Sequence, residues 1–369
     1  MKGRKKLMRW LAVLGMLVPL SLLQGCWDIR DIDNRMLVAV LGIAREDDQG
    51  VKIWVRFPLP HSPLGIGNGD KDFLTASQRG DTASDALDKL RARMPKYLDL
   101  SQTRGIFVDR GLAEEKGVYD CLDFVVRDRM LPINAILALI EGDMGQLFQR
   151  PNPSGELSGV YTRLFFENYA GGTPQKNKVA LWEVFSRHYN PLQQSLVPLL
   201  VKDESFQFNL KGNAFFGNDK MVGWLTPEET LIYELVADRM SPFEIETAGG
   251  ANVKVEASRA QIRTGWASGK PDIRIRIRVT MKLMDSSHAS PMSTRTIEEE
   301  VNKLLEERAV RVFAKTQAKG SDVFGFGNRY RSSLTAGQYK EWADLYKRAS
   351  ITLKVESNMR NVGLKLLRD

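Results

Sequence analysis

The segment DIRIRIRVTMKLM at residues 272–284 alternates apolar and polar side chains without a break. Successive side chains of a β-strand point to opposite faces of its sheet, so this period of two predicts a strand with one buried face. The apolar set, which should face a core, is Ile273, Ile275, Ile277, Val279, Met281 and Leu283. The opposite set is polar and mostly charged, and consists of Arg274, Arg276, Arg278, Thr280 and Lys282.

The arginines of this strand are the feature that most suggests a nucleic-acid surface. A solvated outer face, or a face paired with acids from the helix that follows, is the better explanation. The helical pattern that follows packs through Ile297, Val301, Leu304, Leu305, Val312 and Phe313, and offers acids at Glu298–Glu300, Glu306 and Glu307. We therefore expect a solvated or acid-paired sheet face and no nucleic-acid partner.

The overall charge supports that expectation. The formal net charge is +8, from 53 Lys and Arg against 45 Asp and Glu. Five of the cations, Lys2, Arg4, Lys5, Lys6 and Arg9, lie in the first ten residues, and the other 48 exceed the acids by only three. The bulk of the chain therefore has no strong basic excess.

The N-terminal segment predicts export and lipid attachment. A cationic start precedes an apolar run from Leu11 to Leu23, which is short of the ~20 residues that span a bilayer. The run ends in Leu23-Gln24-Gly25-Cys26, similar to a bacterial lipobox, although Gln24 is a less usual residue there. We expect residues 1–25 to be a cleaved signal peptide and Cys26 to carry lipid. The alternative is an ordinary signal peptide or a short anchor with an accidental cysteine.

The second cysteine, Cys121, lies in the apolar pattern VYDCLDFVVRD. With Cys26 lipidated, the chain has no pair for an intramolecular disulfide. We interpret Cys121 as a small buried residue and not as a reactive thiol.

Local patterns alternate between strands and helices and predict a mixed α/β, or α+β, fold of several domains. Met36–Ile43 predicts a strand buried on both faces, and Gly217-Asn218-Asp219 predicts a hairpin turn. Thr226 is a natural N-cap, followed by Pro227 and by Glu229 at the capping-box position. We expect an N-terminal domain at 26–203 and a C-terminal domain at 204–369, the latter possibly divided into 204–255 and 256–369.

The chain lacks the local signatures of common catalysts. Its three histidines, His61, His188 and His288, are scattered, and no pair has metal-ligand spacing. No nucleophile elbow, His-Glu-x-x-His or Cys-x-x-Cys motif occurs. We expect no enzyme activity, no cofactor and no metal, although a carboxylate pair formed only in the fold stays possible.

The mature start, CWDIRDIDNRMLVAVLGIA, resembles that of the Ger(x)C family, the lipoprotein C subunits of spore germinant receptors. The resemblance continues through DALDKL, GVYDCLDFVVRDRMLPINA and NAFFGNDKMVGWLTPEET, and ends with GSDVFGFGNRYR and EWADLYKRASITLKVESNMRNVGL. One departure is Arg79-Gly80-Asp81, where the family usually has Arg-Gly-Gly.

The resemblance implies a mixed α/β protein without catalysis or cofactor. It implies anchoring through acylated Cys26 on the outer face of the spore inner membrane, next to integral-membrane A and B subunits. Asp322, Phe324, Phe326 and Gly327 form the motif that we expect either to dock a partner or to have a structural role. The alternative function is a solute-binding lipoprotein of an exported transport system, which would need a cleft between two similar lobes; the sequence shows no internal repeat.

Overall fold

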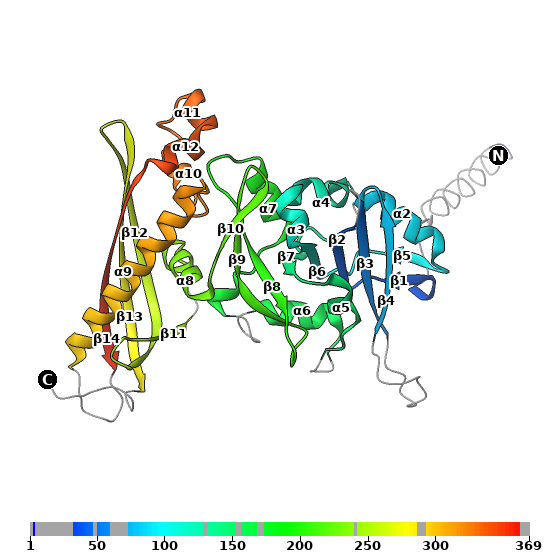
Figure 1. Cartoon of the computed structure of the whole chain (residues 1–369), viewed down its shortest axis with the longest axis horizontal. Coiled ribbons are helices and arrows are strands. Elements are labelled where there is room, and N and C mark those ends of the chain that lie inside the picture. Colours follow the sequence, from blue (N-terminus) through cyan, green and yellow to red (C-terminus); the bar gives the residue numbers. More distant parts are fainter. Residues whose placement is uncertain are drawn as a thin grey trace.

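The computed structural model describes Gly3 and residues 32–46, 50–59, 73–127, 131–152, 156–167, 173–239, 242–285 and 293–361. These residues form an elongated molecule of two units that follow one another along its long axis (Figure 1). The N-terminal unit contains an eight-stranded sheet and the C-terminal unit a four-stranded sheet, drawn in blue to green and in yellow to red, respectively. Mixed sheets with packed helices confirm the predicted α+β, multi-domain fold class.

The N-terminal unit is built on the sheet of order β10-β9-β8-β7-β6-β2-β3-β4. The four central strands β8, β7, β6 and β2 are parallel, and an antiparallel hairpin extends the sheet at each side. The strands are β2 (Val40–Arg45), β3 (Val51–Pro58), β4 (Phe73–Gly80), β6 (Gly105–Asp109), β7 (Ile136–Glu141), β8 (Leu196–Lys202), β9 (Phe208–Gly217) and β10 (Lys220–Leu225).

Helices cover both faces of this sheet, so its central strands are apolar on both sides. One core lies under α2 (Ala83–Arg93), α3 (Arg110–Glu115), α4 (Val118–Arg127) and α7 (Leu181–His188). The opposite core lies under α5 (Met144–Gln149) and α6 (Ser158–Phe166). Cys121 belongs to the first core, where burial raises the pKa of its thiol to about 12, so the prediction of an inert buried cysteine is confirmed.

The strand predicted at Met36–Ile43 is divided in two. β1 (Arg35–Leu37), after the short helix η1 (Ile32–Asn34), pairs in parallel with β5 (Tyr97–Asp99) in a small separate sheet. The chain then changes partners, because the N–H of Val38 bonds to Asp99 and the N–H of Ala39 to Arg56. A continuous apolar run does not reveal this change, since both pieces have the same sequence pattern.

The C-terminal unit is a sheet with helices on one face. Its strands, in the order β11-β12-β13-β14, are β11 (Phe243–Glu246), β12 (Asn252–Ala267), β13 (Lys270–Asp285) and β14 (Ser350–Asn361). The apolar positions of β13 are buried as predicted, in one core with residues of its helices. The helices are α8 (Pro227–Val236), α9 (Thr294–Ala318), α10 (Phe326–Tyr330), α11 (Ala336–Lys340) and α12 (Trp342–Lys347).

The predicted turn and cap that precede this unit are confirmed. Asn218 and Asp219 form the two-residue turn between β9 and β10, both with positive φ. Thr226 caps α8 through a capping box with Glu229, and Pro227 is the first helical residue. The eight-stranded sheet extends past residue 203 through β9 and β10, so the domain division at 203/204 stays a prediction.

Of the two arrangements expected for the β13 arginines, the solvated face is present, and pairing with acids of the long helix is not. Arg274 pairs with Asp272 of its own strand at 2.8 Å, and Arg276 and Arg278 each lie 3.4 Å from Glu356 of β14. Helix α9 packs on the apolar face, so its acids are on the other side of the sheet. The arginine side chains form a solvated face, with 73% of Arg274 exposed.

Two acids of α9 instead bond to the backbone of the edge strand β14. The N–H groups of three alternate strand residues donate to side chains four residues apart on the helix; the pairs are Val355–Glu306 (2.9 Å), Ser357–Asn302 (2.9 Å) and Met359–Glu298 (2.7 Å). Two strand residues rise about 6.6 Å and four helical residues about 6.0 Å, so the two repeats stay in register. The helix thereby covers a sheet edge that could otherwise pair with another chain.

Replacement of Glu306 by Met is expected to lower the free energy of unfolding by about 1–2 kcal/mol, because the buried side of β14 loses an acceptor for the Val355 N–H. Glu306→Gln keeps a carbonyl oxygen at nearly the same place and is the matched control, with a loss of less than about 0.5 kcal/mol. Urea unfolding followed by circular dichroism measures both. Equal losses in the two variants would contradict the role of this hydrogen bond.

Candidate functional site: the Asp322 loop

The carboxylate of Asp322 organises the loop between α9 and α10. It accepts hydrogen bonds from the backbone N–H of Phe326 at 3.1 Å and of Gly327 at 2.8 Å, and from the Trp342 indole N–H at 2.9 Å. The residue is almost completely buried. One side chain thus holds the first turn of α10 and the start of α12 together.

Burial also changes the acidity of this carboxyl group. Loss of solvation raises the pKa of Asp322 to about 6, and the hydrogen bonds from Gly327, Trp342 and Phe326 act in the opposite direction without cancelling it. The group is therefore mostly ionised at neutral pH. It stays there because three N–H donors replace the water that it has lost.

Two aromatic rings fill the space around the loop. Phe324 and Phe326 stack with their ring centroids 5.1 Å apart and their planes at 17°. Phe313 of α9 lies against both, with its centroid 5.2 Å from that of Phe324 and 6.3 Å from that of Phe326. Phe324 also approaches Tyr233 of α8 at 5.9 Å. The loop is packed by its own rings, and these rings also join it to α8 and α9.

Two glycines give the loop its close contacts. Gly325 has a φ of +68°, a conformation that L side chains rarely adopt. A Cβ atom on Gly327 would lie 2.6 Å from the indole nitrogen of Trp342 and 2.8 Å from the Leu192 carbonyl oxygen. A side chain at Gly327 would therefore push α12 away from the loop.

The Leu192 contact is one of several by which this loop joins the two units. The backbone N–H of Gln194 donates to the Asp322 carbonyl at 2.8 Å, and the hydroxyl of Ser321 donates to the Phe216 carbonyl at 2.6 Å. Further side-chain bonds link Asn328 to Gln193 (3.1 Å) and to Asn190 (3.0 Å). We call residues 190–194 and 321–328 the joint.

The residues predicted from sequence thus meet in one place. Asp322, Phe326 and Gly327 are buried and Phe324 is half-buried, so their side chains have little surface to offer a partner. A docking role would have to use exposed neighbours such as Asn328 and Arg329. The predicted lipid-attachment residue, Cys26, lies outside the described residues.

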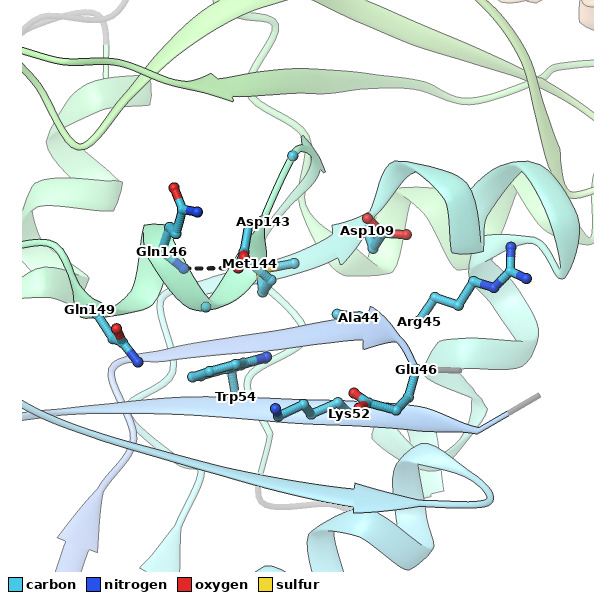
Figure 2. A pocket seen from close by; sticks show the side chains of 12 residues that line it. Ala44, Arg45, Glu46, Lys52, Trp54, Asp109, Asp143, Met144, Gln146 and Gln149 are labelled. Atoms are coloured by element: carbon cyan, nitrogen blue, oxygen red, sulfur yellow. Dashed lines mark hydrogen bonds between the residues drawn. The ribbon is translucent and has the colours of Figure 1, made fainter. Parts of the chain in front are cut away.

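A groove of about 690 Å³ lies at the carboxyl ends of β2, β6 and β7 in the N-terminal unit. Figure 2 shows Lys52 and Trp54 of β3 on one side and Met144, Gln146 and Gln149 of α5 on the other. Open α/β sheets commonly bind ligands at this edge. Sequence reasoning missed the groove, although polar residues after two apolar strands were a signal for it.

The acids of this groove have structural partners. Asp109 caps α3 through the N–H of Leu112 at 2.9 Å, and Asp143 caps α5 through the N–H of Gln146 at 3.0 Å. Glu46 forms an ion pair with Arg79. Within the described residues, no three His, Cys, Asp or Glu side chains are grouped to hold a metal ion. The groove can admit a small polar molecule, and its acids Asp109, Asp143 and Glu46 already have structural partners.

Known proteins match this chain along almost all of its length. A family model described as the spore germination protein N-terminal domain matches residues 28–202, and one described as spore germination B3/GerAC like, C-terminal matches residues 211–363. The chain belongs to the Ger(x)C family of spore germination proteins. Its match to two family models in the expected order confirms the resemblance drawn from sequence motifs.

Individual relatives support this membership. Spore germination protein GerQC of Bacillus cereus is 22% identical, over 96% of this chain and 99% of that protein. Spore germination protein B3 of Bacillus subtilis (strain 168) is 24% identical over 71% of each chain. The crystal structure of the GerBC protein matches 87% of this chain and 97% of its own, with a TM-score of 0.54 at 17% identity, which shows that the fold is shared.

Among the residues that the structure describes, no helix is both long and apolar enough to cross a bilayer.

The joint predicts a strict size limit at Gly327. Gly327→Ala is expected to lower the free energy of unfolding by about 1–3 kcal/mol, because the added methyl group overlaps Trp342 and the Leu192 carbonyl. Gly337→Ala in α11 is the control, since a Cβ there meets nothing within 4 Å. Chemical denaturation measures both, and a Gly327→Ala chain as stable as the control would show that the loop can yield.

The raised pKa of Asp322 predicts a pH dependence of stability. An Asp in an unfolded chain has a pKa of about 3.9, so the folded chain binds more protons between pH ~4 and ~6 and its stability falls as the pH rises through this window. Asp322→Asn removes the titration. The free energy of unfolding of the wild type minus that of the variant should therefore decline by about 2–3 kcal/mol between pH ~4 and ~6.5.

Urea unfolding at a series of pH values tests this dependence. Asp344→Asn on α12 is the control: Lys347 lowers the pKa of Asp344, so its removal should leave the slope in this window unchanged. A difference between wild type and Asp322→Asn that stays constant with pH would refute the assignment.

Proposed function

We propose that this protein is a membrane-anchored lipoprotein subunit of a spore germinant receptor, which docks to integral-membrane A and B subunits during nutrient-triggered germination. The observation that carries the proposal is the family match that begins at residue 28, two residues after Cys26 of the predicted lipobox. Cys26 would be the tether on the outer face of the spore inner membrane. Two or more acyl chains on it would make the attachment stable.

The proposed role is binding and not catalysis. Supporting it, the acids of the sheet groove cap helices or pair with arginine, and the Asp322 carboxylate is enclosed by N–H donors. We likewise propose the division at residues 203/204 into an N-terminal and a C-terminal Ger(x)C domain. The joint would then transmit the position of the anchored domain to the other domain.

Cys26→Ala tests the anchor, and Cys121→Ala is the matched control because Cys121 is a free cysteine in the core. The wild type and the control should fractionate with spore membranes and co-purify with integral-membrane receptor subunits, whereas Cys26→Ala should lose both properties. Mass spectrometry of the mature wild-type N-terminus should find acylated Cys26. An unmodified cysteine or cleavage at another residue would refute the proposal.

The docking role of the loop needs a separate test at its exposed rim. Arg329→Glu changes the charge beside the buried motif, and we expect it to reduce co-purification of the partner subunits while the thermal stability stays unchanged. Exposed Lys340→Glu on α11 is the control. Unchanged assembly and germination with Arg329→Glu would leave the motif with a structural role alone.

The groove of Figure 2 favours one alternative, solute binding. A thermal-shift screen with amino acids and sugars distinguishes it. A robust shift that Trp54→Ala abolishes would favour a solute-binding protein, and no shift would favour the receptor subunit without a ligand of its own.

A further inference from the structure

The outer face of the C-terminal sheet concentrates positive charge across three neighbouring strands. The arginine face, as we call it, consists of Arg259 and Arg263 of β12, Arg274, Arg276 and Arg278 of β13, and Lys354 of β14. The sequence pattern of β13 alone showed three of these six cations. The sheet brings the other three beside them.

The pairing register places like charges directly opposite one another. Across β12 and β13, Arg259 faces Arg278 and Arg263 faces Arg274; across β13 and β14, Arg276 faces Lys354. Like charges opposite each other in neighbouring strands destabilise a sheet. The carboxylates of Asp272 and Glu356 bond to the β13 arginines and offset part of this repulsion. A solvated face could use threonine or glutamine at these positions at lower cost.

The arginine face is also well placed to meet a partner. The opposite face of the sheet packs against α8, α9, α10 and α12. Figure 1 shows α8 between this sheet and the N-terminal unit, so the arginine face points away from that unit at one end of the long molecule. Its side chains are accessible: those of Arg276 and Arg278 are 55% and 61% exposed.

We propose that the arginine face is a docking surface for an acidic protein surface, in which carboxylates pair with the guanidinium groups. Guanidinium forks bind carboxylates in a bidentate geometry, and a flat sheet face suits another protein surface. The six cations span five residues along the strands, and with strands about 4.8 Å apart and residues rising about 3.3 Å, three such strands cover roughly 240 Å². That area fits a weak, salt-sensitive contact and not a permanent one.

Other polyanions fit this face less well. Surfaces that bind single-stranded nucleic acid carry aromatic rings on which bases stack. The outward residues of the three strands include none. They are Arg259, Gln261 and Arg263 of β12, Arg274, Arg276, Arg278 and Thr280 of β13, and Thr352, Lys354, Glu356 and Asn358 of β14. Under the proposed anchoring at Cys26, a lipid surface is also disfavoured, because η1, which closely follows Cys26 in the sequence, belongs to the unit at the other end of the molecule from this face.

Poly-L-glutamate is the defined probe for this surface. The purified chain should bind it at low salt and lose affinity as salt is added. The triple variant Arg259→Gln, Arg263→Gln, Arg276→Gln should bind at least about tenfold more weakly, the loss expected when several exposed ion pairs are removed. The control Lys303→Gln, Arg311→Gln, Lys340→Gln changes the net charge equally on α9 and α11 and should stay within about twofold of the wild type.

Thermal unfolding separates docking from a structural role. Removal of a repulsion should leave the Tm of the triple variant unchanged or raised by a few degrees at low salt. Replacing the same three arginines by lysine keeps the charge and should retain most of the affinity. A triple variant that unfolds or has a lower Tm would contradict the proposal, since it would show that the cations stabilise the sheet.

Two further probes decide the class of partner. Arginine-dependent binding to phosphatidylglycerol vesicles or to duplex DNA, without binding to poly-L-glutamate, would overturn the choice of an acidic protein. Equal binding of the triple and control variants would overturn the surface itself. All these measurements use the purified chain alone, so their outcome is independent of whether Cys26 anchors it in a receptor.

Discussion

The buried carboxylate of Asp322 is the interaction on which the arrangement of the two units depends. Burial of a carboxylate away from water has a large unfavourable free energy, and here three N–H donors from α10 and α12 offset it. These donors come from chain segments that contain no strand of either sheet. Phe326 and Trp342 also belong to the hydrophobic core of the C-terminal unit, so charge and packing fix the loop together. The backbone of that same loop then bonds to residues 190–194, so an interaction inside the C-terminal unit also sets its contact with the N-terminal unit.

The two units also differ in how many faces of their sheets are covered by helices. The central strands of the N-terminal unit have helices on both sides and can therefore be apolar throughout, whereas the C-terminal sheet has helices on one side only. Helix α9 packs its apolar side on this sheet. It also covers the backbone of the edge strand β14 with polar side chains. The outer face is left to solvent, and this is where the arginines gather.

The sequence was sufficient to predict those elements that are determined by residues close to one another in the chain. The alternation of β13, the cap at Thr226 and the turn at Asn218-Asp219 are confirmed because each depends on neighbouring residues. The joint could not be predicted in this way, since Asn328 and Gln193 are 135 positions apart and neither lies in a distinctive pattern. The partners of the α9 acids could not be predicted for a similar reason: helical periodicity gives the side that packs, but not which sheet edge the polar side chains reach.

The same distinction applies to function. The motif around Asp322 is one of those that indicated the family from sequence, yet three of its four residues are buried, so a docking surface would have to be formed by other residues. A surface that binds a partner must be exposed. Whether exposed charged residues form such a surface or an ordinary solvated face cannot be decided until their neighbours across the sheet are known. Three arginines spaced two apart on β13 are an ordinary solvated face when considered alone. Placed opposite Arg259, Arg263 and Lys354, they form a surface that lowers the stability of its own sheet, and a partner that supplies carboxylates would remove that cost.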